Sequence, residues 1–325
     1  MNLDPNLFDP TAVAPETHAF NEGVERDLAA LPVVTDVPVE VTRKAREEGR
    51  GIFGPPILSE RARTLDIPGP AGAITLRVIE PAAGPTRGVY LHIHGGGFVL
   101  GAAHHQDPRR EALADACGVA TVSVEYRLAP EHPFPAGPDD CEAAALWLAD
   151  HAADEFATDT LLIGGESGGA HLAALTVLVL RDRHGRTPFL GANLVYGVYD
   201  LAMTPSAANW GERNLVLSTP IMRWFGAQFL RDLRHPRDPE ISPLYADLRG
   251  LPPALFTVGT MDPLLDDSLF MAARWLAAGN VAELEVLPGA IHAFDAIPRP
   301  LPLREPAVAR IHRFLAGVLR GLSPT

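Results

Sequence analysis

Residues 160–180 read TLLIGGESGGAHLAALTVLVL: an apolar run, a glycine-dense corner and a helical segment that begins near Ala170. The corner contains the pattern G-x-S-x-G, centred on Ser167. In this pattern a sharp turn from strand to helix exposes the serine hydroxyl at the end of a sheet, and the glycines permit close approach of strand and helix. A glycine-rich turn with an incidental serine would have the same local sequence. Whether Ser167 is a nucleophile therefore depends on finding a base and an acid elsewhere in the chain.

Apolar runs and helical segments alternate along most of the chain. Strands apolar on both faces and joined by helices are typical of a mostly parallel sheet that is covered on both sides. Between residues 61 and 80 apolar and polar positions alternate instead, which predicts an antiparallel pair at the sheet edge. The apolar strands are expected at 88–93, 119–124, 160–163, 192–196, 254–258 and 283–287.

Two segments fall outside this alternation. Residues 1 to about 55 are polar, with helices expected over 16–31 and 39–48, and look like an appendage before the main sheet. Residues 200–248 show no strand pattern, yet they carry more apolar bulk than a solvent-exposed loop should. We expect this second segment to be a helical insertion over the sheet.

Composition limits the function classes. Of 325 residues, 47% are hydrophobic and 21% charged, as in ordinary globular proteins, and the net charge of −13 with scattered basic residues disfavours nucleic acid as a partner. The N-terminus lacks a signal-peptide pattern, and the longest apolar stretch, 172–180, is far short of the ~20 residues that span a bilayer. A cytoplasmic protein without a membrane partner is expected, with Cys117 and Cys141 as buried thiols.

A serine nucleophile needs a base and an acid that orients the base. Asp262 and His292 each directly follow a predicted strand, at the sheet edge where ligands bind. The order Ser167, Asp262, His292 is the order of the nucleophile-elbow fold, which favours this histidine among the twelve in the chain. Three rival acids fit less well, because two fall in the following helix and one is too near the histidine in sequence: Asp266, Asp267 and Asp295.

A second motif, His94-Gly95-Gly96-Gly97, follows the predicted strand GVYLHI at 88–93. Successive glycines let backbone N–H groups face a substrate oxygen, and the tetrahedral intermediate of acyl transfer needs such donors. The competing interpretation is a phosphate-binding loop, but the chain has no G-x-x-x-x-G-K-[ST] pattern. The loop therefore predicts an oxyanion hole.

Five blocks together resemble the hormone-sensitive-lipase-like esterases, the bacterial family IV carboxylesterases. They are LHIHGGGFVLG (91–101), VEYRLAPEHPFPAGPDD (124–140), GGESGGAHLA (164–173), GTMDPLLDD (259–267) and GAIHAF (289–294). The resemblance implies an α/β-hydrolase fold, with a central, mostly parallel eight-stranded sheet flanked by helices and a helical cap. It divides the chain into a cap of residues 1–50 and 200–248 and a catalytic domain of residues 51–199 and 249–325.

The resemblance also implies roles. Ser167 becomes the nucleophile, His292 the general base and then acid, and Asp262 the residue that orients His292. The implied oxyanion donors are the N–H groups of Gly96, Gly97 and Gly168. His94, Arg127 and Glu131 look structural, and the cap residues expected to fill the substrate pocket are Trp210, Met222, Trp224 and Phe225.

The chain departs from the usual family pattern at five positions. The strand-to-helix corner at residues 165–170, here called the elbow, has Glu166 where aspartate is usual, Gly168 where alanine is usual and Ala170 where glycine is usual. Glu125 replaces an aspartate, and Ala293 a glycine. None of these changes removes a predicted catalytic group.

The resulting hypothesis is a serine carboxylesterase that acts on small-molecule esters with short- to medium-chain acyl groups, with no cofactor and no metal. An amidase, arylformamidase or lactone hydrolase would use the same residues, and a non-catalytic small-molecule receptor on this fold is a further alternative. Family members often pair through the last strand and helix, here 283–319, which leaves a homodimer open.

Overall fold

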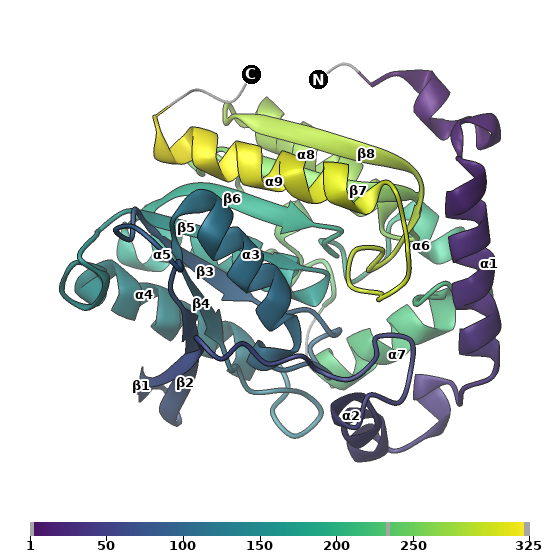
Figure 1. The fold of residues 1–325 in the computed structure, drawn as a ribbon, viewed down its shortest axis with the longest axis horizontal. Coiled ribbons are helices and arrows are strands. Elements are labelled where there is room, and N and C mark those ends of the chain that lie inside the picture. Colours follow the sequence, from purple (N-terminus) through teal and green to yellow (C-terminus); the bar gives the residue numbers. More distant parts are fainter. Residues whose placement is uncertain (1–2, 232–234, 322–325) are drawn as a thin grey trace.

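The computed structural model describes residues 3–231 and 235–321, and an eight-stranded sheet forms its centre (Figure 1). The strand order is β1-β2-β4-β3-β5-β6-β7-β8. β2 pairs antiparallel with β1 and β4, and every other neighbouring pair is parallel, so the predicted edge pair and parallel sheet are confirmed. The strands are β1 (Arg63–Gly69), β2 (Gly72–Ile79), β3 (Val89–Ile93), β4 (Ala120–Val124), β5 (Leu161–Glu166), β6 (Phe189–Val195), β7 (Ala254–Met261) and β8 (Ala282–Ile291).

Helices cover both faces of the sheet. One face carries α3 (Asp107–Cys117) and α9 (Arg304–Leu319), which pack on each other, and the other carries α4 (Ala136–Phe156), α5 (Gly168–His184) and α8 (Leu265–Ala277). Both cysteines are buried and free, as expected. Among the described residues, no helix is long and apolar enough to cross a membrane.

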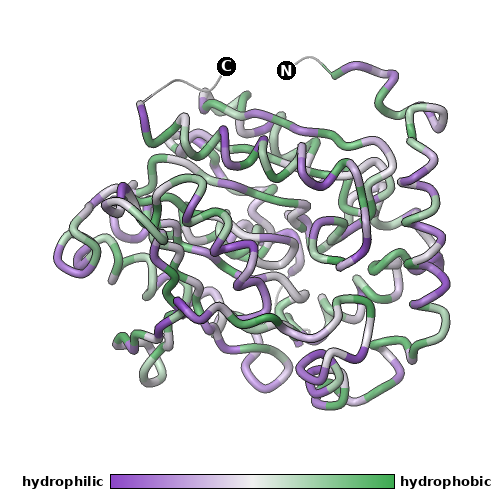
Figure 2. The backbone as a smooth tube through the Cα atoms, in the orientation of Figure 1, coloured by the Kyte–Doolittle hydropathy of each residue, from purple (hydrophilic) through white to green (hydrophobic). Residues whose placement is uncertain are grey.

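The expected cap elements gather at one side of the molecule (Figure 1). They are α1 (Pro15–Ala29), α2 (Val39–Glu47), α6 (Pro205–Asn209) and α7 (Thr219–Leu230). Arg213 of the insertion pairs with Glu25 of α1 at 2.9 Å, which joins the two cap segments. Figure 2 shows that α2 is mostly hydrophilic. The boundaries 1–50, 51–199, 200–248 and 249–325 stay a prediction.

Short 3-10 turns complete the fold. They are η1 (Pro5–Phe8), η2 (Pro10–Ala12), η3 (Val34–Asp36), η4 (Ala103–Gln106) and η5 (Pro243–Tyr245). Within the described part of residues 200–248, extended pairing is limited to a single bridge between Leu215 and Leu217. The insertion is therefore helical rather than part of the sheet, as predicted.

The corner between β5 and α5 is closed by tight backbone packing. Ser167 has φ +56° and ψ −122°, a conformation that costs free energy for a residue with a side chain and that the surrounding structure must hold. A Cβ added at Gly165 or Gly169 would overlap the carbonyl oxygen of Ile93 in β3. Only glycine fits these two places, because the obstacle is backbone and cannot turn aside.

We expect Gly169→Ala to destabilise the protein by about 3 kcal/mol, since overpacking against backbone forces the elbow apart. Gly317→Ala is the matched control, because Gly317 also lies in a helix and a Cβ there meets nothing within 4 Å. That control should gain about 0.5–1 kcal/mol from helix propensity. Urea unfolding followed by circular dichroism measures both changes, and equal effects of the two variants would contradict the packing argument.

Candidate active site

Ser167, His292 and Asp262 meet at the carboxyl edge of the sheet. Ser167 follows β5, Asp262 follows β7 and His292 follows β8. His292 Nε2 lies 2.9 Å from Ser167 Oγ, and His292 Nδ1 lies 2.9 Å from Asp262 Oδ2. Asp262 and His292 are buried, so their interaction is little screened by water. The three side chains form one hydrogen-bonded line that can move the serine proton to the imidazole.

The rival acids have other partners. Asp266 and Asp267 accept hydrogen bonds from backbone N–H groups within residues 199–206. Asp295 accepts a hydrogen bond from Tyr196 Oη at 2.6 Å. The structure therefore brings Asp262, and none of these three carboxylates, into hydrogen-bond contact with His292.

Tyr196 is a neighbour of the site that sequence reasoning missed. Its ring meets the His292 imidazole edge to face, with the centroids 4.8 Å apart. Its hydroxyl donates to Asp295, which also pairs with Arg109. This chain of contacts links the His292 ring to Arg109 through Tyr196 and Asp295. The one available signal was the position of Tyr196 directly after β6.

The glycine loop lies beside the nucleophile. Gly96 and Gly97 have φ of +126° and +60°, conformations that favour glycine, and a Cβ at Gly97 would collide with the Phe225 ring. Their N–H groups donate to no acceptor among the residues that the structure describes. A Cβ at Gly168 would lie 3.3 Å from Gly97 N, so the proposed donors are neighbours in space.

His94 holds this loop in place, in line with the structural role that the family resemblance implies. Burial lowers the pKa of His94 to about 3, so the imidazole is neutral and its Nδ1–H donates to Gly95 O at 2.9 Å. The ring stacks on Tyr126 at 4.3 Å, and Tyr126 Oη donates to His94 O at 2.9 Å. These contacts hold the loop backbone without using the imidazole in chemistry.

Arg127 and Glu131 are held in ion pairs away from the cavity at Ser167. Arg127 makes a two-pronged contact with Asp140, with the shorter distances at 2.8 Å. Glu131 pairs with Arg43 of α2 at 2.9 Å, which ties the YRLAPE block to the cap. Neither Arg127 nor Glu131 lines the cavity, in agreement with a structural role.

Glu166 connects the elbow to two neighbouring elements. Its Oε2 lies 3.0 Å from His92 Nε2 in β3 and accepts from Gln106 Nε2 of η4 at 3.1 Å. Burial alone would raise the pKa of Glu166, but His92, Arg109 and these hydrogen bonds outweigh it and lower the pKa to about 2. The carboxylate is thus charged and doubly held. The longer side chain at this position reaches both neighbouring elements.

A mostly apolar cavity of about 440 Å³ opens at Ser167 and is bordered by both cap segments. Met222 and Phe225 line it, as predicted. Several further lining residues escaped sequence analysis. Four belong to the N-terminal segment, which looked polar and peripheral, one precedes α8, and one lies in α7 beside Met222: Leu31, Val34, Val37, Val41, Leu264 and Ile221.

Trp210 and Trp224 do not line the cavity, contrary to the prediction. On α7, residues 221, 222 and 225 share one face of the helix. Trp224 packs against the cluster that contains Val99 and Leu100, without lining the cavity itself. Trp210 donates its indole N–H to Arg213 O at 2.7 Å. Apolar content alone therefore did not identify the face of the insertion that meets substrate.

This strand order, with the serine at a strand-helix corner and its partners after two later strands, defines an α/β hydrolase. Residues 90–296 match the family described as the alpha/beta hydrolase fold. The chain belongs to this family, in its hormone-sensitive-lipase-like branch.

Relatives agree with this placement. The chain is 37% identical over 300 residues to the carboxylic ester hydrolase LipN of Mycobacterium tuberculosis, covering 90% of this chain and 78% of LipN. It is 30% identical over 292 residues to the acetyl esterase of Salmonella schwarzengrund, covering 87% and 88%. An esterase structure from Pyrobaculum calidifontis superimposes with a TM-score of 0.83 at 30% identity, covering 96% and 100%. The chain is an enzyme of the carboxylic ester hydrolase class.

Proposed function

We propose that the protein hydrolyses short- to medium-chain acyl esters through an acyl-enzyme on Ser167. The observation that carries this proposal is the hydrogen-bonded line of Ser167, His292 and Asp262, which lies beside a glycine loop and opens on an apolar cavity. A receptor without chemistry would not need a base at 2.9 Å from the serine hydroxyl.

In the first step, His292 Nε2 takes the proton of Ser167 as Oγ attacks the ester carbonyl carbon. Asp262 stabilises the imidazolium that forms. The carbonyl oxygen becomes an oxyanion and accepts hydrogen bonds from backbone donors, each contributing ~3 kcal/mol to the transition state. The proposed donors are the N–H groups of Gly96, Gly97 and Gly168.

The tetrahedral intermediate then collapses. The bond from carbon to the alcohol oxygen breaks, and His292 gives its proton to the leaving alcohol. Water then attacks the acyl-enzyme carbonyl while His292 takes one of its protons. The bond to Ser167 Oγ breaks, the serine regains a proton, and the carboxylic acid leaves. His292 thus serves as base and acid in both halves of the reaction.

The cavity supports a limited acyl length. Its lining is mostly apolar, and its volume of about 440 Å³ lies toward the small end of the ~300–1,000 Å³ usual for small-molecule sites. An acyl chain that enters the cavity is removed from water, while a chain longer than the cavity projects past the cap. The acetyl esterase relative is consistent with short acyl groups.

A p-nitrophenyl ester series from acetate to laurate tests this proposal. Each methylene that enters the cavity contributes about 0.8 kcal/mol, so kcat/KM should rise about fourfold per methylene until the cavity is filled. We expect a maximum between butyrate and octanoate. A maximum at laurate would contradict the chain-length proposal. Faster hydrolysis of matched p-nitroanilides would contradict the preference for esters.

A further inference from the structure

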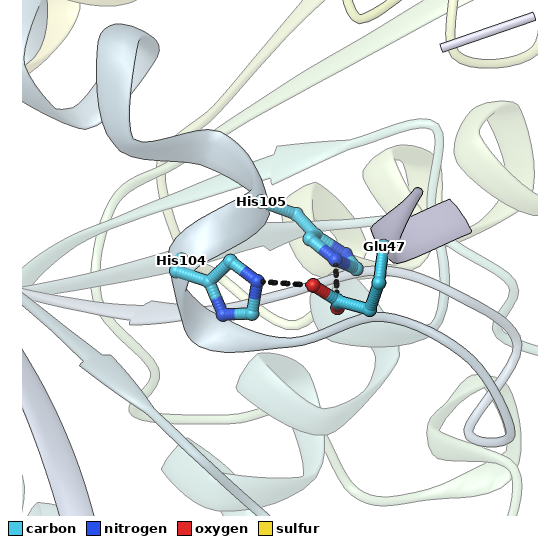
Figure 3. Close-up of side chains that lie close together, drawn as sticks. All are labelled: Glu47, His104 and His105. Carbon is cyan, nitrogen blue, oxygen red and sulfur yellow. Dashed lines mark hydrogen bonds and ion pairs between the residues drawn. The ribbon is translucent and has the colours of Figure 1, made fainter. Parts of the chain in front are cut away.

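A second polar cluster lies where the cap meets the catalytic domain, and it plays no part in the proposed hydrolysis. Glu47 is the last residue of α2, and His104 and His105 lie in η4, which follows the glycine loop. Figure 3 shows the Glu47 carboxylate facing both imidazoles. His104 Nε2 lies 3.0 Å from Glu47 Oε2, and His105 Nε2 lies 2.6 Å from Glu47 Oε1.

Two imidazoles and a carboxylate are a recurring ligand set for divalent transition metals, with metal–ligand distances of about 2.0–2.2 Å. One ligand atom from each of the three residues lies within 4.8 Å of the others. Small rotations of these side chains would bring all three atoms onto one ion. We propose that Glu47, His104 and His105 bind a divalent ion of the zinc type, which ties α2 to the wall of the active site.

An ion would take the place of two hydrogen bonds. Both Nε2 atoms donate to Glu47, since a carboxylate oxygen only accepts. With an ion bound, each imidazole would carry its proton on Nδ1 and offer the Nε2 lone pair to the metal.

The surroundings leave room for access and for a fourth ligand. Glu47, His104 and Glu125 line a surface depression, and the Glu47 and His104 side chains are 47% and 28% exposed. Solvent thus reaches the cluster, and water can complete a tetrahedron around an ion with three protein ligands. Glu125 Oε2 accepts from Ala103 N at 2.9 Å and adds negative charge at the rim.

Two features limit the affinity. Arg46 contributes positive charge near His105, which disfavours a cation. His105 Nδ1 is buried and has no hydrogen-bond acceptor among the described residues, whereas tight sites orient each histidine through such an acceptor. We expect binding about 10- to 100-fold weaker than at a fully supported site, in the micromolar range.

An ion at this cluster would connect the cap to the nucleophile elbow. η4 ends at Gln106, whose side chain donates to Glu166 directly before Ser167. With an ion in place, α2 would be held against the same turn. Metal binding should therefore stabilise the fold and hold the cap over the cavity.

Isothermal titration of EDTA-treated, desalted protein with Zn²⁺ tests the proposal. We expect one site per chain with a micromolar Kd, at least 10-fold weakened in His104→Ala and in Glu47→Gln. His184→Ala is the matched control, because His184 pairs with Glu142 at 2.7 Å as a single imidazole and should leave Zn²⁺ binding unchanged. Titration of Co²⁺ should produce the visible absorption of a nitrogen- and oxygen-ligated ion, which the same two variants lose.

Thermal unfolding gives an independent measurement. At Zn²⁺ 100-fold above Kd, the Tm of the wild-type chain should rise by about 5 °C, and the Tm of His104→Ala should not. Absence of Zn²⁺ binding, or binding that both Glu47→Gln and His104→Ala retain, would overturn the proposal and leave a plain hydrogen-bonded cluster. Neither measurement depends on ester hydrolysis, so failure here would leave the proposed function standing.

Discussion

Ser167→Ala should lower kcat for p-nitrophenyl butyrate by about a million-fold, to the residual rate given by the oxyanion loop and substrate binding. The substitution removes the proposed nucleophile and leaves the backbone corner in place. Stability should stay close to that of the wild-type chain, because the change deletes one oxygen atom at a strained corner. A stopped assay with a high enzyme concentration, together with a melting curve, measures both quantities.

His292→Ala is the companion variant. Because nucleophile and base act as a unit, His292→Ala should cost nearly as much as Ser167→Ala, and the double variant should cost no more than either. A fluorophosphonate probe should label Ser167 in the wild-type chain and label neither variant. Full hydrolysis by Ser167→Ala, or additive losses in the double variant, would show that the reaction does not use this line.

Asp262→Asn should lower kcat by about 10⁴-fold while KM changes little. Asp262 Oδ2 lies 2.9 Å from His292 Nδ1, and Oδ1 accepts from Leu264 N at 2.9 Å, so the side chain has a fixed orientation. An amide of the same shape can present its NH₂ group to Nδ1, which moves the imidazole proton to Nε2 and removes the base. The loss should therefore fall on kcat.

Asp266→Asn is the matched control for this prediction. Asp266 lies four residues away, outside the line, and its Oδ2 accepts from Ser206 N at 2.8 Å. Its substitution should leave kcat near the wild-type value. This result would show that the fall in kcat comes from losing the carboxylate that orients His292, and not from losing any nearby carboxylate. A comparable fall in kcat for both variants would contradict the assignment of Asp262.

The sequence predicted most of the fold because the deciding signals are local. Apolar runs placed β3, β4, β5, β6, β7 and β8. The elbow was readable because a strained corner at Ser167 demands glycine on both sides within a few residues. The strand preceding each of Asp262 and His292 was recognisable, and parallel pairing of β5, β6, β7 and β8 then brings their carboxyl ends to one edge of the sheet.

The pocket was less predictable. Trp210 and Trp224 were expected to line it, yet α7 turns its other face, with Met222 and Phe225, to the cavity. The apolar residues of an insertion show that it packs against the rest of the protein. They do not show which of its side chains face the cavity. Likewise, some lining residues, such as Val37, belong to the N-terminal segment. That segment packs against residues far away in the sequence, so its own pattern does not show that it borders the cavity.

By itself, the sequence determined a mostly parallel sheet covered by helices, the corner at Ser167 and the glycine loop, and its resemblance to a known family implied the α/β-hydrolase fold. The corner and the glycine loop are local features, because glycine spacing within a few residues encodes them. Only the tertiary structure decided that Tyr196 links His292 to Asp295, and that Glu47 meets His104 across 57 positions. Such contacts form when segments that are distant in sequence pack together. A local sequence pattern does not show which distant side chain will be the partner.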